Sequence, residues 1–203
     1  MSLAGDWIAG LSRLRQSLSV EALLYLGRHE AAMAGLRRQL EREPGRVRDA
    51  LVLSSLLAEA GRGEEASLCL ERTLAAAPQA ADAWFNLGFL REAAGQAGAA
   101  EAAFERAVAL APHHDRAWFG LGKLRAARGA LNEAIEALAR AAELQPFAPD
   151  PYQALVDACL AVGRVKEAWG WQARLAAHDP RPAACLAQRI ESYESKLPEG
   201  SCH

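Results

Sequence analysis

The sequence repeats itself with a period of 34 residues, and this period constrains the fold more than any other feature. Three residue types recur at that interval: proline at Pro44, Pro78, Pro112, Pro146 and Pro180, glycine at Gly27, Gly61, Gly95, Gly129 and Gly163, and alanine at Ala32, Ala66, Ala100, Ala134 and Ala168. A period of roughly 20–50 residues is typical of solenoids and other repeat arrays. We therefore expect stacked small units, in which neighbours supply each other's core.

Each repeat has the pattern of two amphipathic helices. In the clearest copy the first helix is predicted over residues 81–94, and the second carries an apolar stripe that includes Ala100 and Phe104. Glycine between the two supplies the left-handed residue that ends the first helix, and proline ends the second. Only 6% of the residues are aromatic, so small side chains must build most of the core.

Residues 83–90 read AWFNLGFL and residues 117–124 read AWFGLGKL, so one octet is written twice with two changes. We interpret the shared tryptophan, leucine and glycine as packing residues. The changed letters, Asn86 to Gly120 and Phe89 to Lys123, are expected to be free of packing and to select a partner.

The motif Trp84-x-x-Leu87-Gly88, followed by Ala100-x-x-x-Phe104, resembles the tetratricopeptide repeat. The next copy matches through Trp118, Leu121, Gly122, Ala134, Leu138, Ala141 and Pro146. The resemblance implies an all-α fold, a right-handed superhelical solenoid of helix-turn-helix units. Five repeats are predicted, over residues 13–46, 47–80, 81–114, 115–148 and 149–182. The first departs from the pattern at Gln16 and Ser19, and the fifth at Val156 and Gln172.

Segments outside the repeats are predicted to cover the two ends of the array. A capping helix is expected over residues 183–197, with an apolar stripe at Leu186, Ile190, Tyr193 and Leu197. Residues 1–12 are expected to form an N-terminal cap through Trp7, Ile8 and Leu11, and residues 198–203 are expected to be a flexible tail.

Stacked first helices of this family line a concave groove, which four places of each repeat face. Carried onto this chain, those places give the candidate partner-binding residues Leu51, Phe85, Asn86, Phe89, Arg116, Phe119 and Lys123. Aromatic and arginine anchors in a concavity are typical of binding hot spots. The alternative is that the phenylalanines bury partly against neighbouring first helices. The family's clamp for chaperone carboxylate termini is incomplete, because Leu51 and Ser55 replace its lysine and asparagine.

Several function classes are disfavoured. The chain shows no Ser/His/Asp order, phosphate loop or metal-spaced His/Cys set, so we expect no enzyme, cofactor or metal site. We interpret His113-His114 as turn residues. A net charge of −2 argues against nucleic-acid binding. Neither a signal peptide nor a membrane-spanning stretch is visible, and the cysteines lack regular spacing. A cytoplasmic, bacterial protein without membrane insertion is the expectation.

The sequence therefore favours a non-enzymatic interaction scaffold that binds a peptide segment or helix of a protein partner. The alternative is a self-assembling or regulatory subunit that uses its end faces or convex side. Trp169 and Trp171 are candidate exposed aromatics for that role.

If the groove is the functional surface and the C-terminal helix caps the array, no apolar end face is left exposed. The isolated chain is then predicted to be a monomer at micromolar concentration. Light scattering in the presence of reductant measures this without a contribution from Cys202. A stable dimer under those conditions would favour the self-assembly alternative.

Overall fold

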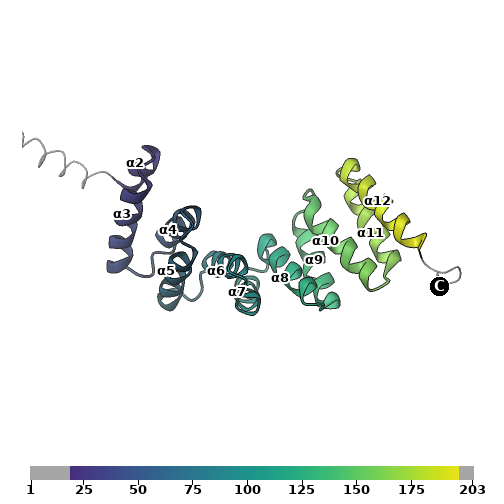
Figure 1. Ribbon diagram of the computed structural model, residues 1–203, viewed down its shortest axis with the longest axis horizontal. Helices are drawn as coiled ribbons and strands as arrows, with labels where there is room; N and C mark the ends of the chain where they lie inside the picture. The colour runs from purple at the N-terminus through teal and green to yellow at the C-terminus, as the bar shows by residue number, and fades with distance from the viewer. Residues whose placement is uncertain (1–18, 197–203) are drawn as a thin grey trace, which may run out of the picture. The chain divides into compact units, whose positions relative to one another are not determined.

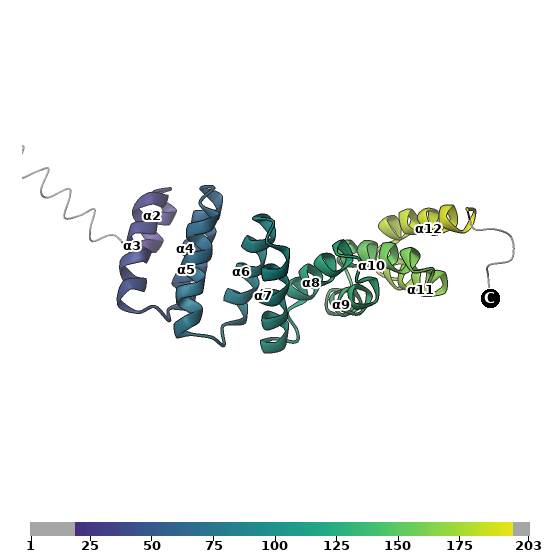
Figure 2. The ribbon, with the colours of Figure 1, turned by 60° about the horizontal axis from the view of Figure 1, so that its bottom comes forward.

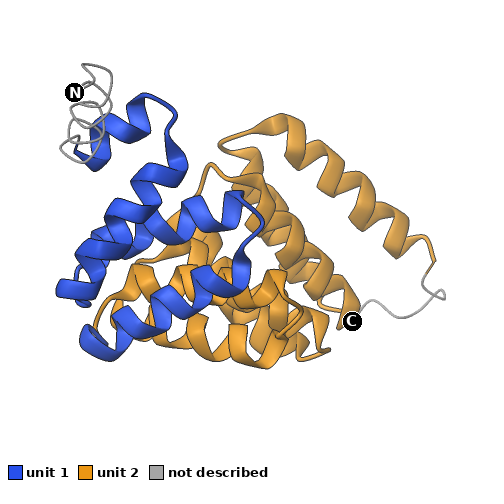
Figure 3. Ribbon diagram, turned by 60° about the vertical axis from the view of Figure 1, so that its left-hand side comes forward, with its two compact units in different colours: residues 1–78 blue, residues 79–203 orange. Residues whose placement is uncertain are grey.

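A computed structural model of the protein describes residues 19–196, and that part of the chain contains eleven helices and no strand. The fold is all-α, as the repeat pattern predicts. The proposed N-terminal cap around Trp7, Ile8 and Leu11, and the tail with Cys202, lie outside the described residues. The chain divides into two compact units, residues 1–78 and residues 79–203 (Figure 3), each of which is described by itself.

Unit 1 contains four helices, each of which packs against the next: α2 (Val20–Tyr25), α3 (His29–Arg42), α4 (Val47–Glu59) and α5 (Gly63–Ala76). Helix α2 begins at Ser19, whose hydroxyl accepts a hydrogen bond from the Ala22 amide at 3.2 Å. The buried side chains of unit 1 include Met33, Leu36, Leu53, Leu57 and Leu70.

Unit 2 contains seven helices: α6 (Ala81–Ala93), α7 (Ala97–Leu110), α8 (Asp115–Ala127), α9 (Leu131–Leu144), α10 (Pro149–Ala161), α11 (Val165–Ala176) and α12 (Pro180–Glu194). They form successive antiparallel pairs that stack along the chain (Figures 1 and 2). The first helices of successive pairs also touch, since α8 contacts both α6 and α10.

A left-handed glycine separates the two helices of every pair. The five glycines Gly27, Gly61, Gly95, Gly129 and Gly163 have φ between 65° and 84°, and no other described residue has a positive φ. An L side chain at such a position is strained, whereas glycine adopts it at no steric cost. The sequence therefore encodes the turn of each helical hairpin in one residue.

A close contact between helices surrounds the ring of Phe104, which is 1% exposed. A Cβ added at Gly88 on α6 would lie 2.7 Å from the Phe104 ring, and one added at Gly120 on α8 would lie 2.8 Å from it. The prediction that packing leaves residue 120 free is therefore wrong. Gly120 is buried, and it is required because the ring of the preceding repeat fills the space beside it.

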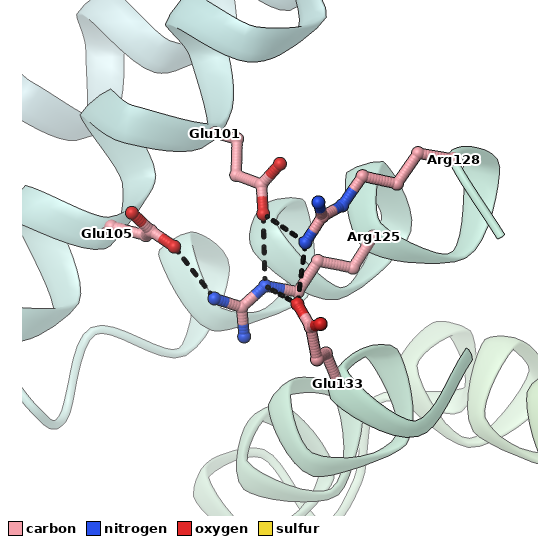
Figure 4. A network of polar contacts seen from close by, with 5 residues as sticks. All are labelled: Glu101, Glu105, Arg125, Arg128 and Glu133. Carbon is pink, nitrogen blue, oxygen red and sulfur yellow. Dashed lines mark hydrogen bonds and ion pairs between the residues drawn. The ribbon is translucent and has the colours of Figure 1, made fainter. Parts of the chain in front are cut away.

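An ion-pair network joins α7, α8 and α9 on another side of these helices (Figure 4). The guanidinium of Arg125 lies 3.2 Å from Glu101 and 2.8 Å from Glu105, and 3.7 Å from Glu133. Arg128 pairs with two of these three carboxylates, Glu101 at 3.1 Å and Glu133 at 2.6 Å. Side chains of Arg125 and Glu101 are mostly buried, so solvent screens this network less than an exposed pair.

Helix α12, which spans Pro180–Glu194, packs against α11 and α10. Leu186 and Ile190 are fully buried against unit 2, whereas Gln188 and Glu191 are exposed. The Arg189 guanidinium ties α12 to α10 through Asp157 at 2.6 Å. The polar outer face of α12 ends the apolar stripe within the described residues.

The glycine contact predicts opposite effects for two glycine-to-alanine substitutions inside helices. Gly120→Ala should destabilise the fold by about 1–3 kcal/mol, because its methyl group would overlap the Phe104 ring. Gly170→Ala in α11 is the matched control. It meets nothing within 4 Å and should stabilise the fold by about 0.5–1 kcal/mol through helix propensity. Thermal or urea unfolding measures both. Equal effects would show that the contact with Phe104 is wrong.

Candidate functional site

A strip of polar and aromatic side chains runs along the face that α6 and α8 share. Asn86, Phe89 and Glu92 follow one another at intervals of three residues, which places them on one side of α6. Phe89 is 55% exposed, although it is a large hydrophobic residue. The side-chain amide of Asn86, half-buried beside it, has no hydrogen-bonding partner among residues 19–196.

Helix α8 contributes Arg116, Phe119 and Lys123 to the same strip, again at helical spacing. The Lys123 ammonium lies 3.3 Å from Glu92 Oε1 and 5.8 Å from the centre of the Phe119 ring. The Glu92–Lys123 ion pair therefore joins the two helices across the strip. We call this set of six residues, namely Asn86, Phe89, Glu92, Arg116, Phe119 and Lys123, the α6–α8 strip.

Phe85, a candidate anchor from the sequence, is only 7% exposed. Its ring lies 5.9 Å from the ring of Phe104 and 4.6 Å from that of His114. The Arg116 guanidinium covers it at 4.8 Å, a cation–π distance. Phe85 therefore packs as the alternative interpretation of the phenylalanines describes. Phe119 is intermediate: it is half-buried against the core and remains partly accessible.

His114 is the cap of α8 and a wall of the Phe85 pocket. Its Nδ1 accepts a hydrogen bond from the Ala117 amide at 3.3 Å. In the neutral ring the hydrogen then resides on Nε2, which lies 3.5 Å from the Asp82 carboxylate. His114 is therefore a turn residue, as predicted, and in that turn it caps α8 and packs against Phe85.

Leu51, the remaining candidate, belongs to α4 of unit 1 and is half-buried. Its carbonyl oxygen accepts hydrogen bonds from the hydroxyls of Ser54 and Ser55, at 2.9 and 3.0 Å. It is described with unit 1 and is not a member of the α6–α8 strip.

Trp169 and Trp171 are not the exposed aromatics that the alternative function needs. Both are half-buried against the core of unit 2. The indole of Trp169 donates a hydrogen bond to Glu194 at 3.2 Å, and Trp171 packs against Tyr152 and beneath Arg174. Capping helix α12 accounts for the burial of Trp169, which the sequence of α11 alone does not show.

Glu92 is the member of the strip that sequence reasoning missed. It lies outside the four places that the family resemblance selects, one turn after Phe89. The available signal was its spacing of three residues from Phe89, which places both on one helix face. No cluster of three or more metal-ligating side chains occurs within residues 19–196. No helix of this part of the chain has the length and apolar character to cross a membrane.

Two sequence profiles described as tetratricopeptide repeat match the chain, over residues 51–90 and residues 92–156. Together they cover about half of the sequence, including the helices of the α6–α8 strip. With the helical hairpins and their glycine turns, these matches show that the protein belongs to the tetratricopeptide repeat family.

Solved structures of the same fold agree. The crystal structure of MamA superposes with a TM-score of 0.66 at 21% identity, covering 87% of this chain and 95% of that one. YrrB, described as a tetratricopeptide repeat protein with an unusual peptide-binding site, gives 0.68 at 21% identity, with coverages of 85% and 88%. PilF of Pseudomonas aeruginosa gives 0.69 at 18% identity, with 87% and 81%. Comparison with proteins of curated function finds no significant match. At these identities the structures support the shared fold alone.

The different burial of two phenylalanines on α6 predicts different effects on stability. Phe85→Ala should cost about 3–5 kcal/mol, because it empties a buried site between Phe104 and His114. Phe89→Ala removes an exposed ring and should change the free energy of unfolding by less than about 0.5 kcal/mol. Chemical denaturation of the two variants tests this. A comparable loss in both would mean that Phe89 is a core residue.

Proposed function

We propose that the protein is an interaction scaffold and that the α6–α8 strip binds a peptide segment of a protein partner. The observation that carries the proposal is the exposure of Phe89. A phenylalanine that is 55% exposed on a helix of ordered, well-packed neighbours contributes little to folding. Its place on the inner helices of a tetratricopeptide array is the one at which this family meets its ligands.

Asn86 and Phe89 together offer the two kinds of contact that an extended peptide requires. The unpaired amide of Asn86 can both donate to and accept from a peptide backbone. One turn along α6, the Phe89 ring offers an apolar surface to a side chain of the peptide. Such a pair of a rigid aromatic anchor and a polar group is typical of peptide-recognition hot spots.

The charge of the strip favours a partner with acidic residues beside its apolar anchor. Arg116 is exposed, and Lys123 is half-exposed with only Glu92 as an ion-pair partner. An acidic side chain of the ligand would meet two cations and would share Lys123 with Glu92. Exposed pairs of this kind contribute little to affinity, but they raise the rate of association and fix the register.

The peptide-binding site of YrrB, in a chain of the same fold, supports a peptide as the ligand class here. The partner of the present chain is defined by its chemistry: one or two large apolar side chains flanked by acidic residues.

The test uses partners captured by the wild-type protein from lysate of the source cell, followed by affinity measurements on each. Phe89→Ala should weaken binding by about 1–3 kcal/mol, as the loss of an anchor does. Lys123→Glu should act mainly through the association rate and its dependence on salt. Phe147→Ala is the matched control, because Phe147 is 72% exposed, belongs to the same unit and lies outside the strip.

Circular dichroism should show wild-type helicity for all three variants. Unchanged binding by Phe89→Ala and Lys123→Glu, or an equal loss in Phe147→Ala, would exclude the strip as the binding site.

A further inference from the structure

Unit 1 has a groove on its second helices that is independent of the α6–α8 strip. It has a volume of about 490 Å³ and lies between α3 and α5, above α4. Its apolar lining comes from Leu40 on α3, Leu53 and Leu57 on α4, and Leu68 and Cys69 on α5. Leu68 is 47% exposed at its edge. The volume is within the range of about 300–1,000 Å³ that is usual for sites that bury a ligand.

The equivalent groove two repeats further along the chain has a different chemistry. It lies between α7 and α9, above α8, and has a volume of about 600 Å³. Arg125 occupies the place of Leu57 there, and Glu136 occupies that of Leu68. Arg125 belongs to the ion-pair network of Figure 4 and pairs with Glu105 of the same lining at 2.8 Å. Leu57 and Leu68, at the equivalent places between α3 and α5, form no ion pairs and present an apolar surface. Such a surface is typical of a binding site.

Two charged residues line the same groove without an ion-pair partner among residues 19–196: Glu41 on α3 and Arg72 on α5. The other pair of charges, Arg37 and Glu65, is already joined at 3.0 Å. An occupant that suits the groove therefore has an apolar centre, one acidic group and one basic group.

Residues 1–18 of the chain have this composition. Trp7, Ile8 and Leu11 have the spacing of one apolar helix stripe, with Asp6 before them and Arg13 after them. An apolar centre thus lies between one acidic and one basic residue, the reverse set of charges to Arg72 and Glu41.

The described chain begins beside α3, one of the two helices that border the groove. A Cβ added at Gly35 on α3 would lie 3.3 Å from Val20 Cγ2, so α2 starts beside the middle of α3, on the side of that helix away from the lining residues Arg37 and Leu40. Arg13 and Ser19 are six positions apart in the sequence and can be separated by at most about 20 Å, which exceeds the helix diameter of about 10 Å. A segment tethered this closely has an effective concentration of about millimolar, which favours it over a second copy.

We propose that the groove between α3 and α5 is a docking site for the chain's own residues 1–12, with Trp7, Ile8 and Leu11 as the inserted side chains. The segment then covers the leucines of unit 1. The α6–α8 strip of unit 2 takes no part in this contact.

Cys69 reports on the occupancy of the groove because it is part of the lining and only partly buried. In a Cys185→Ser/Cys202→Ser background, the remaining other thiol is Cys159, which is buried and whose pKa burial raises to about 11. The rate of alkylation of Cys69 is measured by peptide mass spectrometry in the full chain, in a chain lacking residues 1–12, and in a full-length Trp7→Ala/Leu11→Ala variant.

Both variants should react about tenfold faster at Cys69 than the full chain does, because the docked segment no longer covers the thiol. A tenfold change corresponds to a groove that is occupied about nine-tenths of the time in the full chain. Ser2→Ala/Ser12→Ala removes two uncharged polar groups outside the apolar stripe and serves as the control, with less than about a twofold change. The double substitution keeps the test valid if the deletion disturbs folding.

Equal alkylation rates in the full chain and the Trp7→Ala/Leu11→Ala variant would overturn the proposal. Protection of Cys69 that increases with protein concentration would also overturn it, because a second copy would then be the occupant.

Discussion

The close approach of α6 and α8 around a single aromatic ring determines the geometry of unit 2. Phe104 can lie between these helices only because neither residue 88 nor residue 120 has a Cβ on that side. The ring belongs to the second helix of one repeat, yet it touches the first helices of two. It thereby fixes the separation of the two helices that carry Phe89 and Lys123, and the Glu92–Lys123 ion pair depends on that separation.

The same backbone supports different chemistry in different repeats. Between α7 and α9 the lining includes Arg125 and Glu136, and Arg125 pairs with Glu105 of the same lining. Between α3 and α5 the places of Arg125 and Glu136 are taken by Leu57 and Leu68. The two grooves share their helix arrangement because the packing residues recur with the period. The side chains outside the packing stripes are free to change. They give the groove between α7 and α9 an internal ion pair and leave the groove between α3 and α5 with an apolar surface.

The period, the all-helical fold and the glycine turns could be predicted from the sequence, because each depends on contacts within one repeat. Gly120 could not, because its requirement comes from Phe104 of the preceding repeat and the aligned octets show only a variable position. Phe85 and Phe119 occupy the same place in successive repeats, but their exposure differs. His114 covers Phe85, while Ala148, one period later, has no ring with which to cover Phe119. Such differences depend on neighbours that a repeat-by-repeat comparison treats as unrelated.

The left-handed glycines have a consequence for how an array of this kind can change in length. One inserted or deleted residue inside a hairpin rotates everything after it by about 100° about the helix axis, which moves the apolar stripe away from its neighbours. The turn cannot compensate for that rotation, because its backbone conformation is one that only glycine adopts without strain. Length variation by single residues is therefore costly throughout the array, whereas gain or loss of a full 34-residue unit leaves every stripe in phase. The length of the array is therefore expected to change in steps of whole repeats.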